Sequence, residues 1–412
     1  MRITLLLAFS LTVGLAAADG RTYYADPAKG SLENDGSATK PWPALAETVQ
    51  VGKLAALKAG DSLLLRSGKH GAVQISGDNA GMVLVAAEKG QTPQLARLVV
   101  QQGANWTFRG LSISPAFGEA YSGNMVSLGE GGPSHDLVLE DSFVHSTLDT
   151  AAWTAEQWMK ANSGVNMGRH GTRITVRNNH ILNTRFGLNI SSFEALVEGN
   201  IISDFSADGI RATRDGAVVQ YNVIKNCYVS SGDGDKNHDD GIQAFLFNKG
   251  TGTVRNIAVR GNVLVNREDP QQRFPASMQG IGFFDGPLIG FTIADNVVVS
   301  AAWHGIALYD AQACTITGNT VLTQPGTEKC KSWIMLGTKP NVKAAHGNTV
   351  SGNQAASFKL KDDGEVKAEK NVTVTDESFD TALKMALTEI DKRFGAKHPV
   401  SGQVRLARIQ YH

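Results

Sequence analysis

One short phrase, repeated along the chain, decides the fold. It reads VRNNHI at residues 176–181, VEGNII at 197–202 and VQYNVI at 219–224, then VRGNVL (259–264), IADNVV (293–298), ITGNTV (316–321) and VSGNQA (350–355). The first asparagines lie 21 and 22 residues apart, Asn296 and Asn319 lie 23 apart, and no helical period intervenes. Such a repeat, with three short strands per coil, predicts an all-β, single-domain right-handed parallel β-helix whose asparagines stack from coil to coil. A β-sandwich is the alternative, but sandwiches do not repeat one motif at this period.

A second phrase recurs between the asparagine motifs. Glycines at 164, 187, 209, 241, 280 and 305 each precede a strand with alternating apolar side chains. Because side chains alternate along a strand, the residues between the apolar ones face outward. These outward positions are Asn166, Asn189, Arg211, Gln243, Gly282 and Ala307. One step further, Phe245, Phe284 and Tyr309 stand in register, which suits either a ligand platform or an aromatic ladder that only stabilises the coils.

The rest of the chain divides around these coils. Residues 19–58 are expected to form an N-terminal cap with a helix over 45–57, and 59–372 the β-helix. We expect insertions at 115–162, 226–238 and 265–277, because these stretches do not follow the repeat, and long loops on a rigid scaffold often carry function. Residues 373–412 are expected to form a C-terminal helix and tail, since a helical period runs from Asp376 to Phe394 and stops at Gly395, as a terminal cap would.

The N-terminal residues indicate export. Residues 1–18 combine Arg2, an apolar stretch and three small residues before the expected cleavage point, as a secretory signal peptide does. An uncleaved anchor helix is the alternative. We therefore expect a secreted or periplasmic protein without a membrane span after cleavage. Export allows a Cys314–Cys330 disulfide and leaves Cys227 over, although three cysteines cannot make a disulfide scaffold.

Composition excludes some classes of partner. The 39 Lys and Arg residues balance the 39 Asp and Glu residues, which argues against a general nucleic-acid binder. Glycine is in excess, at 44 of 412 residues or about 11%, against an average near 7%. A chain so rich in glycine needs many turns or close backbone approaches.

The insertion before Gly241 carries the densest group of reactive side chains. Asp208 and Asp240 each precede the glycine of consecutive coils, and adjacent strands lie about 4.8 Å apart, so each carboxylate would raise the pKa of the other. His238 and Asp239 belong to the same group, and His304 takes the pre-glycine position two coils beyond Asp240. Two carboxyls at such a spacing could act as acid and base in glycoside hydrolysis. Turn chemistry is the alternative, because Asp-Gly is a common corner.

Two further features suggest ligands. Arg211 projects from the polar part of the outer face beside Asn189 and Gln243, where a guanidinium can pair with a sugar carboxylate. Asp233, Asp235 and Asp239, with Asn237, alternate in a pattern that suits Ca²⁺, whereas a solvated acidic loop is the alternative. Motifs for zinc, for phosphate and for an organic cofactor are absent from the sequence.

The repeats over 170–355, together with the opening YYADPAKGSLENDGSATKPWPAL (23–45), resemble the right-handed parallel β-helix superfamily of pectate lyases, alginate lyases, polygalacturonases and uronan epimerases. SADGI at Asp208 and NHDDGI at 237–242 are similar to the polygalacturonase carboxylates, but Gln279 stands where that family has His. For a lyase, the resemblance implies groups that neutralise a uronate and a base. The residues available for binding a sugar are Asn166, Arg185, Asn189, Lys236, Gln243, Phe245, Phe284, His304 and Tyr309.

The first hypothesis is a polysaccharide lyase that acts on an acidic, uronic-acid-containing glycan by β-elimination. In it Arg211 binds the carboxylate, His238 is the base, and Asp239 or Asp240 orients the base. An inverting glycoside hydrolase that uses Asp208 and Asp240 is the second hypothesis, and a uronan C5-epimerase is the third. A glycan-binding β-helix without catalysis comes from a different class. Oligomeric state is left open.

Overall fold

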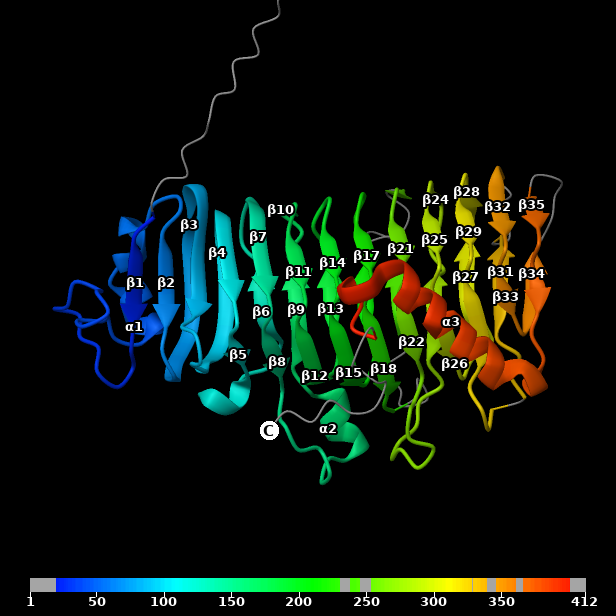
Figure 1. Cartoon of the computed structure of the whole chain (residues 1–412), viewed down its shortest axis with the longest axis horizontal. Coiled ribbons are helices and arrows are strands. Elements are labelled where there is room, and N and C mark those ends of the chain that lie inside the picture. The colour runs from blue at the N-terminus through cyan, green and yellow to red at the C-terminus, as the bar shows by residue number, and fades with distance from the viewer. Residues whose placement is uncertain are drawn as a thin grey trace, which may run out of the picture.

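The chain winds into a long solenoid of parallel strands (Figure 1), in a computed structural model that describes residues 20–229, 238–244, 253–327, 329–338, 346–360 and 366–400. Each coil contributes a strand to each of three stacks, which we call sheets I, II and III. This confirms the predicted right-handed parallel β-helix. The first coils are built from β1 (Thr22–Ala25), β2 (Ser62–Leu65), β3 (Gly68–Ala87) and β4 (Pro93–Arg109).

Sheet I contains the strands that follow the repeated glycines, with one earlier and two later members. They are β6 (Asn124–Leu128), β9 (Ser163–Met167), β13 (Leu188–Ile190), β16 (Ile210–Ala212), β19 (Asp240–Ala244), β23 (Gln279–Phe283), β27 (His304–Tyr309), β31 (Trp333–Gly337) and β34 (Ser357–Leu360).

Sheet II comes next in each coil and ends at the asparagine corner. Its strands are β7 (Ser134–Glu140), β10 (Gly171–Thr172), β11 (Thr175–Arg177), β14 (Leu196–Glu198), β17 (Val218–Gln220), β21 (Ala258–Arg260), β25 (Thr292–Ala294), β29 (Thr315–Thr317), β32 (Asn348–Ser351) and β35 (Val366–Glu369). A small separate sheet holds β20 (Val254–Arg255), β24 (Leu288–Ile289) and β28 (Ala311–Gln312).

Sheet III follows the corner and leads back to sheet I. Its strands are β5 (Ser112–Ile113), β8 (Phe143–His145), β12 (His180–Thr184), β15 (Ile201–Phe205), β18 (Val223–Cys227), β22 (Val263–Val265), β26 (Val297–Ser300), β30 (Thr320–Thr323), β33 (Gln354–Ala355) and β36 (Val372–Thr373).

The repeated asparagines form the ladder that their spacing predicts. Each donates from Nδ2 to Oδ1 of the next, from Asn179 through 200, 222, 262, 296, 319 and 353 to Asn371, over 2.9–3.0 Å. Each Oδ1 also accepts the backbone N–H of the preceding asparagine. The residue before each asparagine has a positive φ, which puts glycine at several of these corners, including Gly199 and Gly261. The ladder therefore provides hydrogen-bond partners for the polar side chains buried at this corner.

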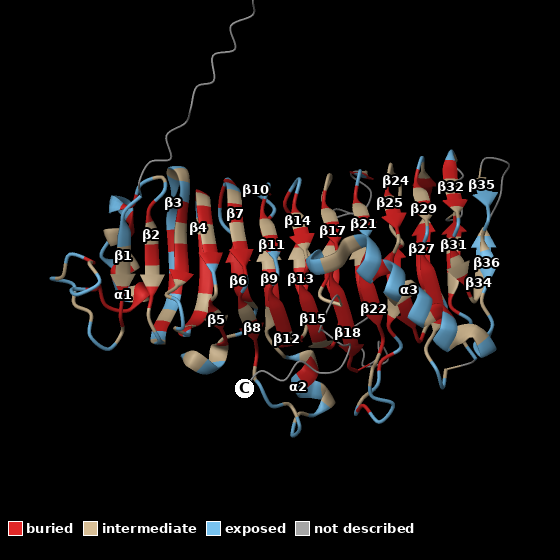
Figure 2. Cartoon of the chain, in the orientation of Figure 1, coloured by how far each residue is buried: buried red, intermediate tan, exposed pale blue. Residues whose placement is uncertain are grey.

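The interior is a continuous apolar core that runs the length of the solenoid (Figure 2), built by the inward side chains of all three sheets. The outer side of sheet III is also apolar from Ile201 to Leu322, and helix α3 (Phe379–Phe394) covers it with Ala382 and Ile390. A short 3₁₀ turn, Asp376–Ser378, precedes that helix and another, Gly395–Lys397, follows it. The C-terminal helix thus exists as predicted but lies along the side of the solenoid, not over its last coil.

Several boundaries differ from the sequence-based prediction. The cap segment contains α1 (Leu45–Gln50) and a 3₁₀ turn, Lys53–Ala56, in place of one helix to residue 57, and its β1 already pairs with β2. Within 115–162, which we expected to lie outside the repeat, β6, β7 and β8 complete a regular coil. A 3₁₀ turn, Pro115–Phe117, precedes them. Only 146–162, with α2 (Ala155–Met159), leaves the coil. The insertion expected at 265–277 occupies 266–278.

Two other expectations can be compared with the structure. Cys227, Cys314 and Cys330 are all free, so the Cys314–Cys330 disulfide that export would allow is not formed. Within the described part of the chain, the helices are too short or too polar to cross a bilayer. The expected signal peptide, 1–18, lies outside the described residues.

Candidate functional site on sheet I

The outer face of sheet I carries the polar column that the alternation predicts. Asn166 pairs with Asn189, Asn189 with Arg211, Arg211 with Gln243, and Gln243 with Gly282 on successive coils. The first four are half-buried. Asn189 Nδ2 donates to Asn166 Oδ1 over 2.8 Å, and Asn166 donates to Glu130 over 2.8 Å. Parallel pairing thus gathers two amides, a guanidinium and a third amide on one surface.

Arg211 is held rigidly. Its Nε donates to Asp208 Oδ2 over 2.5 Å, and its guanidinium carbon lies 3.9 Å from the centre of the Phe186 ring. Asp208 Oδ1 accepts the backbone N–H of Asp240 over 3.1 Å. The Asp208 side chain is fully buried, whereas 22% of the Arg211 side chain is exposed. A buried carboxylate and a flat aromatic ring therefore fix a guanidinium that still reaches the surface.

Asp240 is a buried carboxylic acid. It has no exposed surface, and Gln243 Nε2 donates to its Oδ2 over 2.8 Å. Burial, with Asp208 and Asp239 nearby, raises the pKa of Asp240 well above its usual value, although Gln243 and Arg211 oppose the shift. Its Oδ1 lies against Gly282, where a Cβ atom would come within 2.4 Å of that oxygen. Burial therefore favours the protonated form of Asp240, and only glycine fits opposite it.

Two histidines flank Phe284 at the edge of this surface. The exposed His238 meets the Phe284 ring edge-on at 5.8 Å between ring centres, and His304 does so at 5.1 Å. His304 Nδ1 lies 2.7 Å from Gln279 Oε1. Because an amide oxygen only accepts, Nδ1 carries the proton and Nε2 is unprotonated in the neutral ring. Burial, together with His238, lowers the pKa of His304, which keeps that ring neutral at pH 7.

An aromatic surface continues along the later coils. Phe284 contacts Tyr309 at 5.7 Å between ring centres, which confirms that these two stand in register. Trp303, 45% exposed, stacks on Trp333 at 5.1 Å, and Trp333 also meets His304. The sequence analysis missed Trp303 and Trp333, as it missed Phe186 beneath Arg211. The available signal was their position near the repeat: Phe186 directly precedes Gly187, Trp303 lies two residues before Gly305, and Trp333 opens β31.

Of the remaining predicted site residues, some have a described position near the site and others lie outside the described residues. Arg185 lies near the site: its guanidinium donates to the Met159 carbonyl of α2 and sits 5.3 Å from the Phe186 ring. Asp239 is buried beside Asp240. Asp233, Asp235, Lys236 and Phe245 lie outside the described residues. The Ca²⁺ prediction therefore stays a prediction, and within the described ranges no three His, Cys, Asp or Glu side chains are grouped to hold a metal.

Comparison with known proteins agrees with this architecture. Residues 163–328 match the family model described as right handed beta helix region. A mannuronic acid specific polysaccharide family 6 lyase from human gut microbiota is 12% identical, with 89% of this chain and 94% of that chain covered and a TM-score of 0.54. XylC, solved with xylose, is 8% identical over 85% and 86%, with a TM-score of 0.51.

A lacto-N-biosidase from Eubacterium ramulus is 15% identical, with 86% of this chain and 68% of that chain covered, at a TM-score of 0.47. Among curated proteins, none matches the sequence. The chain is a right-handed parallel β-helix protein, and at these identities the comparisons show its fold alone.

Proposed function

We propose that the protein is a polysaccharide lyase that cleaves a uronic-acid-containing glycan by β-elimination on sheet I. The observation that carries this proposal is the fixed guanidinium of Arg211, set in register between Asn189 and Gln243, with His238 at the start of the adjoining coil. A guanidinium between two amides suits a sugar carboxylate, and its charge makes the neighbouring C5 proton more acidic.

The charge balance of the site supports binding of an anion. Asp208 is neutralised by its ion pair with Arg211, and the protonated form of Asp240 is favoured because this carboxyl is buried beside another one. If Asp240 were ionised, the surface would carry a net negative charge and repel a uronate. The protonated Asp240 therefore acts as a positioning residue, which accepts from Gln243 and adds no negative charge to the Asp208–Arg211 ion pair as the sugar approaches.

His238 is the proposed base. It is exposed and belongs to the same coil as Gln243, which pairs in register with the coil of Arg211. Its imidazole takes the C5 proton, the C–H electrons form the C4–C5 double bond, and the C4–O4 bond breaks towards oxygen, which takes a proton from water. His304 lies two coils beyond, so with Phe284 and Tyr309 it is assigned to a neighbouring sugar.

A glycoside hydrolase is the second candidate, because a protonated carboxyl like Asp240 is the group that serves as general acid in such enzymes. Burial argues against this role. Both candidate carboxyls, Asp208 and Asp240, have no exposed surface, and both Asp208 oxygens accept hydrogen bonds. A general acid must reach the glycosidic oxygen within hydrogen-bond distance, and a base must reach a water.

The test is to incubate the purified protein with a panel of uronic-acid polysaccharides. We expect ultraviolet absorbance from an unsaturated uronate to grow in step with new reducing ends. New reducing ends without that absorbance would establish hydrolysis instead. Exchange of the C5 proton with deuterated solvent, without chain cleavage, would indicate an epimerase, and binding without any of these signals would indicate a glycan-binding protein. Secretion and Ca²⁺ dependence belong to the same proposal, and a chelator that leaves activity and melting unchanged would remove Ca²⁺ from it.

A further inference from the structure

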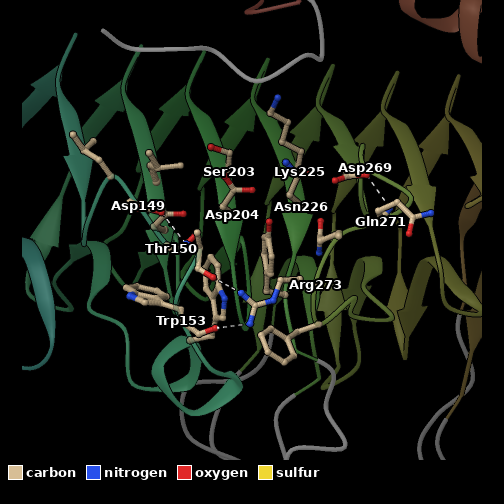
Figure 3. A pocket seen from close by; sticks show the side chains of 18 of the residues that line it. Asp149, Thr150, Trp153, Ser203, Asp204, Lys225, Asn226, Asp269, Gln271 and Arg273 are labelled. Carbon is tan, nitrogen blue, oxygen red and sulfur yellow. Dashed lines mark hydrogen bonds between the residues drawn. The ribbon is translucent and has the colours of Figure 1, made fainter.

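A cavity of about 430 Å³ lies beside sheet III (Figure 3), and none of the polar-column residues of sheet I lines it. Its walls come from three parts of the chain: residues 148–158 of the excursion that holds α2, residues of β12, β15 and β18, and residues 269–274 of the insertion before β23. Ligand sites in proteins commonly measure about 300–1,000 Å³. The cavity is therefore large enough for one or two sugar rings.

The walls are fastened to one another. The Arg273 guanidinium donates to the backbone carbonyls of Ala151 and Trp153, which joins the insertion to the excursion across the cavity. Gln272 Nε2 donates to the Cys227 carbonyl over 2.6 Å. Trp158 stacks on Tyr228 with 4.2 Å between ring centres. These contacts hold the cavity open in a defined shape, so a ligand would bind without first ordering the loops.

The cavity combines an aromatic wall with a polar floor. Trp153 stands half-buried at its side and meets Trp158 edge-on at 4.8 Å. The floor carries Asp204 from β15 and Lys225 and Asn226 from β18. An apolar ring face beside several hydrogen-bonding groups matches a sugar, which has one apolar C–H face and a rim of hydroxyls.

Charge decides which kind of sugar fits. Three carboxylates line the cavity, those of Asp149, Asp204 and Asp269, against two cations, Lys225 and Arg273. Lys225 is already paired with Glu268 at 2.9 Å, and Arg273 with two carbonyls. The lining side chains carry three carboxylates and two cations, an excess of one negative charge, which disfavours a uronate carboxylate and suits hydroxyls that donate to the carboxylates. This is the reverse of the sheet I surface, where Arg211 is presented.

We infer that this cavity is a second carbohydrate-binding site, which takes a neutral mono- or disaccharide unit and operates separately from sheet I. The inference does not rest on the proposed lyase activity, because it uses none of the sheet I residues. It would let the protein hold a neutral sugar of a mixed glycan while the uronate part lies elsewhere on the solenoid.

The test is isothermal titration of the whole protein with neutral disaccharides (xylobiose, cellobiose and lactose), with digalacturonate as the acidic comparison. We expect at least one neutral disaccharide to bind and digalacturonate not to compete for its site. Trp153→Ala should weaken that binding by about tenfold or more, a loss of about 1.4 kcal/mol or greater. Tyr309→Ala on sheet I should leave it unchanged, which serves as the matched control.

Trp153→Ala also removes packing against Trp158, so a second variant keeps the test sharp. Thr150→Phe replaces a small lining residue with a ring that fills the cavity, leaves the other wall residues in place, and should abolish binding while the melting temperature stays within a few degrees of the parent. Absence of binding for all three neutral disaccharides would overturn the inference. So would retention of binding in Thr150→Phe, or equal binding and competition by digalacturonate. Uronan cleavage measured on the same samples reports on sheet I separately.

Discussion

Two columns run along this solenoid at one residue per coil, and they differ in almost every respect. The corner between sheets II and III repeats one residue type from Asn179 to Asn371, and each side chain bonds its successor. The pre-glycine column of sheet I varies in residue type, from Phe186 through Asp208 and Asp240 to Gln279 and His304. The first satisfies its own hydrogen bonds. In the second, Asp208 bonds to Arg211 of the following strand, and Gln279 bonds to His304 of the next coil. These bonds hold the Arg211 and His304 side chains in place at the surface.

The difference separates structure from chemistry within one repeating scaffold. A uniform buried column gains from repetition, because every asparagine offers the donor and acceptor that its neighbour needs. A column that brings carboxyls and an imidazole together has no such gain. Burial of Asp208 and Asp240 costs free energy unless each carboxylate is paired with a cation or is protonated. Where a solenoid departs from its repeat at such a cost, function is the expected reason.

The largest effect is expected from Arg211→Met. The substitution should abolish uronan cleavage, by about 100-fold or more, because the carboxylate loses its cation. It should also lower the free energy of unfolding by about 3–5 kcal/mol, since Asp208 stays buried without its partner. Denaturant unfolding and initial rates measure the two effects. The double variant Asp208→Asn/Arg211→Met removes the unpaired charge and should recover stability but not activity; recovery of activity would mean that Arg211 serves only the fold.

Substitutions in the asparagine ladder should instead lower the stability of the fold. Asn222→Ala removes the Oδ1 that accepts from both the backbone N–H and the side chain of Asn200, and that site is fully buried. We expect a loss of about 3 kcal/mol or more, from two orphaned donors. Asn371→Ala is the matched control at the half-buried end of the ladder, where water can replace the lost bonds, and about 1 kcal/mol is expected. Equal losses at the two positions would contradict the role of burial.

A smaller, pH-dependent effect on the free energy of unfolding is expected from Asp240 in the pre-glycine column. The pKa of Asp240 in the folded protein lies above its ordinary value of 3.8, so the folded state keeps a proton that the unfolded chain releases. The stability due to this group is complete below that ordinary value and is lost as the pH rises through the folded pKa. Asp240→Asn stays neutral, so its advantage over the parent in free energy of unfolding should grow from pH 4 upward. A constant difference between the two proteins would mean that Asp240 is ionised.

Much of the fold was predictable from the sequence, because one residue type marks each coil. The coil at 124–145 escaped prediction for the same reason. Ser142 takes the corner position there, and its backbone N–H donates to Asn179 Oδ1. The ladder continues while its signal in the sequence stops. Asn371, after the last recognised phrase, was missed in a similar way.

The site was predicted only in part, because sequence gives register but not burial. Alternation placed Arg211 between Asn189 and Gln243 correctly. It could not show that Asp208 forms an ion pair with Arg211, or that Asp240 is enclosed beneath Gly282 and Phe284, where burial raises its pKa. The cavity beside sheet III was beyond reach, because its walls come from insertions more than a hundred residues apart that follow no repeat.

The most direct test of the central claim compares His238→Ala with Asp240→Asn in the rate of unsaturated-uronate formation, with melting of each variant measured alongside. If sheet I performs β-elimination with an exposed imidazole as base and a buried neutral acid for positioning, His238→Ala should lose about 100-fold or more. Asp240→Asn keeps the neutral state and the shape, and its rate should stay within about tenfold. The reverse pattern, with folded Asp240→Asn inactive and His238→Ala active, would contradict the account and make Asp240 the acid of a hydrolase.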